Sequence, residues 1–243
     1  QFICHYSRPS RGELHTMPSL ASKLSSLTSQ PSTNGVFPKE WIREKNLFSL
    51  LKDGNSRAVE NEILASKICR CFDCRQVLYE ESMFDGQKVS KSRIITSVDY
   101  SMVSMEAFEI YAANHDIHVM DFVLKLDAYS YYMMNLLDYL IGNTDRHWGN
   151  WGFLVDNRTN QPVRLFDLMD LNQTFLAYDT PDGANCMTTG NRKMSQREAA
   201  VEAVKKIGLN QRAEIKDEWF EGREKEREMF WCRFGILKEQ WKA

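Results

Sequence analysis

The chain is organised around one stretch, Tyr139-Leu140-Ile141-Gly142-Asn143-Thr144-Asp145-Arg146-His147-Trp148-Gly149-Asn150. An apolar run over 131–141 with helical spacing stops at Gly142, and Asp145 and Asn150 follow it five positions apart. A glycine after a periodic apolar run is a typical helix end. We therefore predict a helix followed by a loop that carries both polar side chains.

A hairpin is predicted to follow this loop. Residues 151–155 are aromatic and apolar, a polar turn comes next, and a second apolar run over 163–169 ends on Asp170. Phosphoryl transfer from a magnesium nucleotide uses an Asp that meets the acceptor hydroxyl, an Asn that holds magnesium, and a further Asp on the metal that bridges the phosphates. The order Asp145, Asn150, Asp170 predicts this chemistry, with ATP and Mg2+ as cofactors.

A second aspartate competes for the metal position. Asp167 closes Leu165-Phe166-Asp167, which also places an Asp after an apolar and an aromatic residue. We favour Asp170, because Leu171-Asn172-Gln173 then lies where the turn after the metal-binding Asp of a kinase lies. Both remain candidates at this point.

A lysine and a glutamate upstream fit the same chemistry. Residues 41–43 and 47–51 read as two strands, and Lys52 closes the second. A helix is predicted from about Ser56, with Glu62 in its early turns and one apolar face made by Val59, Ile63, Leu64 and Ile68. A strand lysine followed by a helix glutamate is the pair that anchors nucleotide phosphates in kinases.

The remaining pattern predicts an α+β fold of two lobes. Further strands are expected at 76–79 and 92–98, flanking a polar turn at 85–87. The pattern then changes to helices, which we expect at 105–114, 119–126, 127–141, 195–207 and 217–242. Ser195 and Glu198 form a capping-box pattern at the start of the fourth of these helices.

We predict that the lobes divide after residue 103. The N-lobe, 1–103, would hold a small antiparallel sheet and one helix, preceded by a polar, proline-punctuated segment over 1–34 in which a short helix is expected at 19–24. The C-lobe, 104–243, would be mainly helical and carry the loop and the hairpin. This arrangement corresponds to a bilobal, protein-kinase-like architecture.

Composition excludes several other classes. The chain has 243 residues, a net charge of −2 and 43% apolar residues, which gives no strong nucleic-acid signal. The apolar run 131–142 is interrupted by Asn135 and Asp138, so we predict no membrane span. Residues 1–10 lack a signal-peptide pattern. The six cysteines, including Cys69, Cys71 and Cys74, suggest reduced thiols used for packing and a cytoplasmic protein.

These motifs resemble one family. Asn143-x-Asp145-x-His147-x-x-Asn150 is similar to the catalytic loop of HipA-like serine/threonine kinases, and Asp-Arg-His-x-x-Asn also to that of phosphoinositide-type kinases. The other segments that resemble HipA-like kinases are Ser32-x-x-Gly35-x-x-x-Lys39 for the phosphate loop, Leu50-Leu51-Lys52 for the ATP lysine strand, Glu62-Ile-Leu-Ala65-Ser66 for the helix glutamate, and Leu165-x-x-Leu168-Met169-Asp170 for the metal-binding segment. Together they cover residues 32–170 in the family's order.

The resemblance implies a role for each matching residue. Asp145 would orient and deprotonate the acceptor hydroxyl, and Asn150 and Asp170 would hold magnesium. Lys52 would hold the α- and β-phosphates, with Glu62 beside it, and the segment with Ser32, Gly35 and Lys39 would cover the phosphates. His147 would brace the loop, while Arg146 would pair either with the transferred phosphate or with a neighbouring carboxylate.

The substrate is less well defined than the nucleotide. The chain has no Gly-x-Gly-x-x-Gly loop and no Ala-Pro-Glu segment, and it reads Asp-Arg-His where protein kinases read His-Arg-Asp. The resemblance implies a protein acceptor or autophosphorylation near Ser32, and an antitoxin-like protein partner. Two alternatives stay open: a catalytically silent nucleotide- or partner-binding pseudokinase, and a kinase for a lipid or small-molecule hydroxyl.

Overall fold

The computed structural model describes residues 38–44, 47–53, 55–176, 178–190 and 193–242. The predicted polar segment 1–34, the short helix at 19–24, Ser32 and Gly35 lie outside these ranges. The described part of the chain has mixed helices and antiparallel sheets, as predicted. None of its helices is long and apolar enough to cross a membrane.

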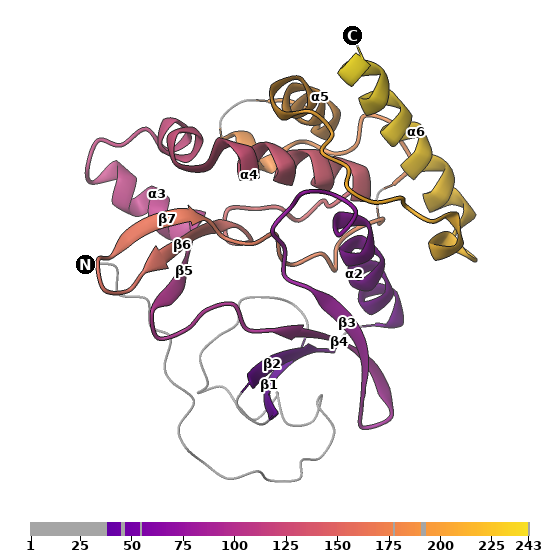
Figure 1. Cartoon of the computed structure of the whole chain (residues 1–243), viewed down its shortest axis with the longest axis horizontal. Coiled ribbons are helices and arrows are strands. Elements are labelled where there is room, and N and C mark those ends of the chain that lie inside the picture. Colours follow the sequence, from indigo (N-terminus) through magenta and orange to yellow (C-terminus); the bar gives the residue numbers. More distant parts are fainter. Residues whose placement is uncertain (1–37, 45–46, 54, 177, 191–192, 243) are drawn as a thin grey trace.

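A four-stranded sheet and one helix make up the first half of the described chain. The elements are β1 (Lys39–Glu44), β2 (Leu47–Lys52), α2 (Ser56–Cys69), β3 (Tyr79–Phe84) and β4 (Gln87–Arg93). The described strands are antiparallel and lie in the order β1-β2-β4-β3, so that β2 pairs with both β1 and β4. Helix α2 packs against β3 and β4, and Asn55 begins it by accepting a hydrogen bond from the Ala58 amide (Figure 1).

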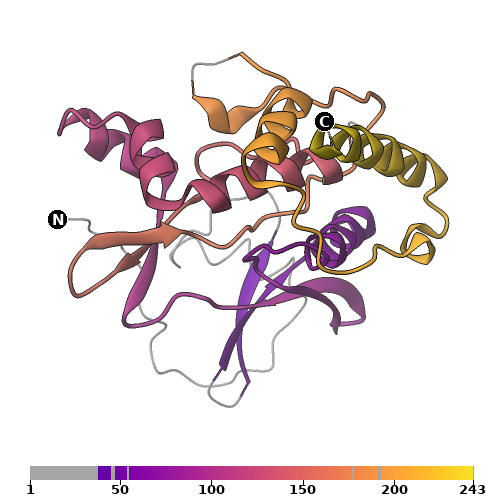
Figure 2. The ribbon, with the colours of Figure 1, turned by 45° about the horizontal axis from the view of Figure 1, so that its top comes forward.

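A second sheet and the helices make up the rest. These elements are β5 (Tyr100–Ser104), α3 (Met105–Ala113), α4 (Val119–Ile141), β6 (Gly152–Asp156), β7 (Gln161–Leu165), η1 (Met187–Thr189), α5 (Gln196–Ile207), η2 (Asp217–Phe220) and α6 (Glu224–Lys242). Within the described residues the second sheet has the order β5-β6-β7. Figure 2 shows α5 and α6 on the side of α4 that faces away from the first sheet.

Helix α4 lies at the centre of the core and is bent at Asp127. The φ and ψ angles of this residue, −155° and 63°, are not helical. Its carboxylate accepts hydrogen bonds from the backbone N–H groups of Ser130 and Leu165 and from the guanidinium of Arg75. The predicted break between 119–126 and 127–141 is thus seen as this kink, and the following turns bury almost every side chain from Met133 to Ile141.

Local backbone geometry also defines the end of α4 and the starts of α5 and α6. Gly142 ends α4 with a left-handed φ of 58°, and a Cβ at this position would come within 2.4 Å of the Tyr178 ring. Ser195 and Glu198 form the predicted capping box at the start of α5. The helix predicted over 217–242 is interrupted, because the chain turns at Gly222, with φ 69°, between η2 and α6.

The two strands of the β3–β4 hairpin were predicted at the wrong positions along the chain. Its strands directly flank Asp85 and Gly86, which have φ angles of 48° and 77°, and do not lie at 76–79 and 92–98. Most β3 side chains after Tyr79 face solvent at least in part, so the strand lacks the apolar alternation on which the prediction depended.

Strand β5 was not predicted, and it pairs with β6 in the second sheet. It ends one residue after the predicted lobe boundary at 103, so a strand of the second sheet falls on the N-lobe side of that boundary. The division into lobes at 103 stays a prediction.

Candidate active site

Lys52 at the end of β2 contacts the next element, α2, and a segment that is distant in the sequence. Its Nζ lies 2.8 Å from Oε1 of Glu62 on α2 and 2.7 Å from Oδ1 of Asp170 in the segment after β7. Lys52 and Glu62 are almost completely buried, at 5% and 1% exposure. The structure therefore brings together the lysine, the glutamate and the aspartate that the sequence pattern had singled out.

The charges in this group stabilise one another. Burial alone would lower the pKa of Lys52, but the carboxylates of Glu62 and Asp170 outweigh it and hold that pKa well above its usual value. Burial alone would raise the pKa of Asp170, but the Lys52 ammonium holds it below its usual value. The Lys52 ammonium and the Asp170 carboxylate therefore stabilise each other's charged forms in a largely buried site.

Two further side chains hold this group in place, and sequence reasoning missed both. Ser90 on β4 donates a hydrogen bond to Oε2 of Glu62. The hydroxyl oxygen of Tyr79 accepts a hydrogen bond of 3.0 Å from the Asp170 backbone N–H, and its ring lies 5.2 Å from the Lys52 Nζ. Ser90 stands directly opposite Lys52 in the sheet, a relation that only the strand register reveals.

The Lys39 side chain approaches the same place. Lys39 is the β1 partner of Lys52, so both side chains point to one face of the sheet. Burial, and after it the neighbouring Lys52 ammonium, lower the pKa of Lys39, while Asp170 and Glu62 act in the opposite direction. The predicted phosphate-loop partners of Lys39 lie outside the described residues.

The loop after α4 places Asp145 and Asn150 in contact. Nδ2 of Asn150 donates to the Asp145 backbone oxygen at 2.9 Å and lies 3.3 Å from its Oδ2. Asn150 is buried, whereas the Asp145 side chain is 45% exposed. The buried amide thus fixes a carboxylate that remains accessible to another molecule.

Arg146 lies inside the loop and not at its surface. Its Nε and Nη2 bond to both carboxylate oxygens of Asp138 at 2.8 and 3.0 Å. Its Nη1 donates to the backbone oxygens of Asn150 and Met169, at 2.8 and 2.6 Å. Of the two partners predicted for Arg146, the structure has the neighbouring carboxylate. Asp138 was not singled out as its partner, although it is a charged residue in the apolar run 131–141.

Asn143 completes the inner side of the loop. Its Nδ2 donates to Oδ1 of Asp138 at 2.9 Å, and its Oδ1 accepts from the Asp145 backbone N–H at 3.1 Å. Gln196 of α5 donates to the Asn143 backbone oxygen at 2.5 Å. The backbone that carries Asp145 is therefore held from α4 and from α5.

His147 lies beside Asp145 at the surface. Its Nδ1 accepts a hydrogen bond of 3.0 Å from the Gly149 N–H, and its Nε2 lies 3.8 Å from Oδ1 of Asp145. The first contact tightens the turn that leads to Asn150. This position agrees with the predicted bracing role, which stays a prediction.

The two candidate aspartates differ in their partners. Asp167 pairs with Arg164 on β7, with Nη1 and Oδ1 2.5 Å apart. Asp170 contacts Lys52, and its φ of 57° is unusual for a residue other than glycine. The structure thus brings Asp170, and not Asp167, to the lysine, while the choice of metal ligand stays a prediction.

Oxygen donors are available for a magnesium ion. The described residues contain no group of three or more His, Cys, Asp or Glu side chains placed to hold a metal. One carboxylate, Asp170, and one amide, Asn150, supply the donor types that Mg2+ prefers, and substrate phosphates and water commonly complete its shell. Arg146 links the backbone beside both residues. The donor set therefore fits a magnesium nucleotide better than a protein-only metal site.

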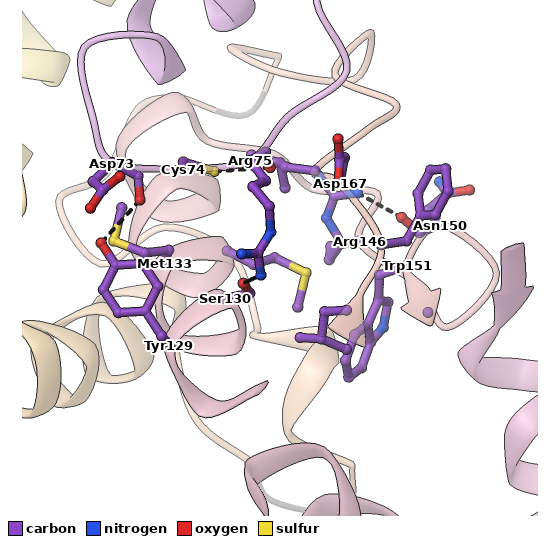
Figure 3. A pocket seen from close by; sticks show the side chains of 15 residues that line it. Asp73, Cys74, Arg75, Tyr129, Ser130, Met133, Arg146, Asn150, Trp151 and Asp167 are labelled. Atoms are coloured by element: carbon purple, nitrogen blue, oxygen red, sulfur yellow. Dashed lines mark hydrogen bonds between the residues drawn. The ribbon is translucent and has the colours of Figure 1, made fainter. Parts of the chain in front are cut away.

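A separate cavity of about 130 Å³ adjoins the same loop. Figure 3 shows it between the segment with Cys74 and Arg75, the Ser130 turn of α4 and the residues around Trp151. Its lining includes Arg146 and Asn150 but not Lys52, Glu62 or Asp170. It is therefore distinct from the place where the lysine and the carboxylates meet.

Among the comparisons with known proteins, the likeness to one solved structure, CtkA, supports the fold. No family model matches the chain, and no curated protein matches its sequence. The proinflammatory kinase CtkA of Helicobacter pylori is similar in structure, with a TM-score of 0.57 and 15% sequence identity over 84% of this chain and 90% of that one. HipA of Shewanella oneidensis MR-1, solved in a toxin–antitoxin complex with HipB and operator DNA, gives a TM-score of 0.48 and 11% identity over 97% of this chain and 76% of that one. The chain has a kinase-like fold.

Proposed function

We propose that this protein is an ATP- and magnesium-dependent kinase of the HipA-like serine/threonine type. The observation that carries the proposal is the double contact of Lys52 with Glu62 and Asp170, at 2.8 and 2.7 Å. Active kinases need both the lysine–glutamate pair and the metal-binding aspartate in place. The kinase-like fold supports the same conclusion.

Lys52 supplies the cation for the nucleotide. Its ammonium is held by Glu62, which is in turn bonded to Ser90, so its position is fixed before a phosphate arrives. A preorganised charge in a site with little water stabilises developing negative charge without reorganisation. Lys39, on the same face of the sheet, adds a second ammonium to this side of the site.

Asp170 and Asn150 would hold magnesium, which when bound neutralises charge on the β- and γ-phosphates. Asp145 would receive the proton of the acceptor hydroxyl. Its carboxylate is half-exposed, so that an acceptor can reach it, and its backbone and Oδ2 are held by Asn143 and Asn150. A general base positioned in this way contributes about 10²–10⁴-fold to a rate.

The decisive experiment is transfer of the γ-phosphate of ATP by the purified protein. Wild type is compared with Asp145→Ala, and Asp182→Ala, another exposed aspartate outside the site, serves as the matched control. We expect the signal to fall by about 10²-fold or more in Asp145→Ala, as the loss of a general base predicts, and to persist in the control. Equal signals from wild type and Asp145→Ala would exclude the kinase proposal and favour the silent nucleotide-binding alternative.

The acceptor is proposed to be a hydroxyl on a protein, including this chain near Ser32. Mass spectrometry after incubation with magnesium and ATP should find phosphate on the peptide that contains Ser32, and Asp145→Ala should lack it. Transfer to an added protein without any modification of that peptide would remove the autophosphorylation part and leave the kinase activity standing.

A further inference from the structure

Asn61 is a buried polar residue on α2 that connects the helix with two distant segments. It is fully buried, and its Nδ2 donates to the Thr174 backbone oxygen at 2.6 Å. Its Oδ1 accepts from Nη2 of Arg223 at 2.5 Å. Its backbone oxygen lies 3.3 Å from Oγ1 of Thr174, which is closer, at 2.8 Å, to the Leu171 oxygen. Both ends of the side-chain amide are therefore bonded to segments more than a hundred positions away.

The burial of Arg223, the partner of Asn61, is energetically unfavourable. It lies in the turn between η2 and α6, is 8% exposed, and its guanidinium stands over the Phe175 ring at 5.1 Å. Burial, and after it the nearby Arg57, lower its pKa to about 10. Its Nε has no hydrogen-bond partner among the described residues. A buried guanidinium with an unpaired N–H destabilises a fold unless its other contacts repay it.

A second contact joins the same elements. Glu226 in the first turn of α6 bonds to Arg57 in the first turn of α2 and lies 3.5 Å from Nη2 of Arg223. Figures 1 and 2 both place the start of α6 beside α2. The C-terminal segment therefore holds α2 at two successive places along its length.

The next residue along α2 is Glu62, the partner of Lys52. Consecutive helical residues point about 100° apart, so Asn61 and Glu62 face different neighbours on one rigid helix. Asn61 meets the C-terminal segment and the chain after Asp170, while Glu62 meets the sheet. A rotation or slide of α2 that releases one of them displaces the other as well.

We propose that Asn61 and Arg223 form a latch by which the C-terminal segment 217–242 keeps Glu62 engaged with Lys52. Arg223 and Asn61 are positioning residues in this account, because they act on the site through α2 and do not touch the nucleotide. The latch positions α2 whether or not the protein is a kinase, and only its effect on phosphate transfer rests on the proposed function.

Chemical labelling of Lys52 tests the latch without reference to activity. In the latched state Lys52 is buried and paired, so an amine-acetylating reagent should modify it slowly, as measured by mass spectrometry relative to the exposed Lys216. Opening of α2 would expose it, and the labelling rate then reports the open population. The variants are Arg223→Met, Asn61→Ala and, as the matched control, Arg227→Met, a partly exposed arginine of α6 four positions after Arg223.

The expected result is a rise of about tenfold in the Lys52 labelling rate in Arg223→Met and in Asn61→Ala, since each loses a buried hydrogen bond that involves a charged group. Arg227→Met should match wild type, and Arg223→Lys should fall between. A wild-type rate in Arg223→Met, or an equal rise in Arg227→Met, overturns the latch. If thermal unfolding shows that Arg223→Met and Asn61→Ala do not fold, Arg223→Lys decides: it keeps the positive charge and most of the side chain but loses Nη2, and it must also raise the rate.

Activity measurements separate this proposal from the function. If wild type transfers phosphate, Arg223→Met should lower kcat in proportion to the labelling change, while Arg227→Met leaves it unaltered. A wild-type protein without transfer would defeat the proposed function and leave the labelling contrast valid. Normal transfer without a labelling contrast would defeat the latch alone.

Discussion

Two buried charged clusters, one within the loop that carries Asp145 and one around Lys52, are built differently. The Arg146 cluster consists of Arg146, Asp138 and Asn143; its arginine makes a two-point contact with one carboxylate, and its remaining donors reach backbone oxygens. The Lys52 cluster consists of Lys52, Glu62 and Asp170, with two carboxylates around a single ammonium.

The difference indicates which cluster is scaffold and which is site. In the Arg146 cluster each charge is matched within the protein, so a ligand would have nothing to add. In the Lys52 cluster two carboxylates share one ammonium and Lys39 approaches from β1, so no charge is closed in a two-point pair and a magnesium nucleotide can take up part of these contacts. Neutralising the first cluster should damage the fold, and neutralising the second should damage the chemistry.

The largest expected effect comes from breaking the Arg146 cluster. Arg146→Met would leave Asp138 buried without its partner, which costs about 3–5 kcal/mol of the free energy of unfolding. Urea denaturation should show this loss. Arg197→Met, which removes an exposed ion pair with Asp182, should cost less than about 1 kcal/mol. Similar losses in both variants would contradict the division into scaffold and site.

The second-largest effect is expected on phosphate transfer when Asp170 is neutralised. Asp170→Asn should reduce phosphate transfer by about 10²–10³-fold, the range seen when one preorganised electrostatic group is lost. The midpoint of thermal unfolding should fall only modestly, because Lys52 loses its contact with a charged Asp170 but retains Glu62, and the amide keeps the shape. Asp167→Asn is the matched control, and an equal loss of activity there would return the metal role to Asp167.

A smaller effect should follow from Ser90. Ser90→Ala removes the hydrogen bond to Glu62 and should lower the free energy of unfolding by about 1 kcal/mol. Because Glu62 would then hold Lys52 less firmly, the KM for ATP should rise. The kcat, which depends on proton removal by Asp145, should not change. Ser92→Ala on the same strand, also buried, is the matched control. A change in KM shared by both variants would count against a specific role for Ser90.

The smallest effect concerns acid stability. The folded pKa of Asp170 lies below its unfolded value, so this carboxylate contributes stability that is complete above the unfolded pKa, about 3.9, and is lost as pH falls through the folded pKa. Urea denaturation between pH 6 and pH 3 should therefore show a shallower acid loss in Asp170→Asn than in wild type. An identical slope in the two proteins would mean that Lys52 does not stabilise the charged carboxylate.

Much of the site could be predicted because its members lie at element ends. Lys52 closes a strand, Asp145 follows a helix that stops at glycine, and Asp170 follows a hairpin, so sequence periodicity located all three. The periodicity of 127–141 also located the kink. Glu60 and Glu62 both lie in the early turns of the predicted helix, and only the resemblance of Glu62-Ile-Leu-Ala65-Ser66 to the family segment singled out Glu62.

The rest depends on relations that one sequence does not contain. Ser90 faces Lys52 only through strand register, and β3 and β5 have too little apolar alternation to reveal their register. The partner of Arg146 is Asp138, and a charged residue in an apolar run can be predicted to be buried without indicating what it binds. Arg223 lies 162 positions from Asn61, in a turn that the pattern had predicted as continuous helix.

The bend at Asp127 limits which residues can replace this aspartate. The Asp127 carboxylate accepts hydrogen bonds from the start of a helical segment, from the end of β7 and from Arg75 in the chain that leaves α2. No other side chain offers two acceptor oxygens and a negative charge at so short a reach, since glutamate is longer and asparagine is neutral. Position 127 should therefore be among the last to tolerate exchange in a library of random variants selected only for folding, whereas Asp145, which no buried cation needs, should accept many replacements there.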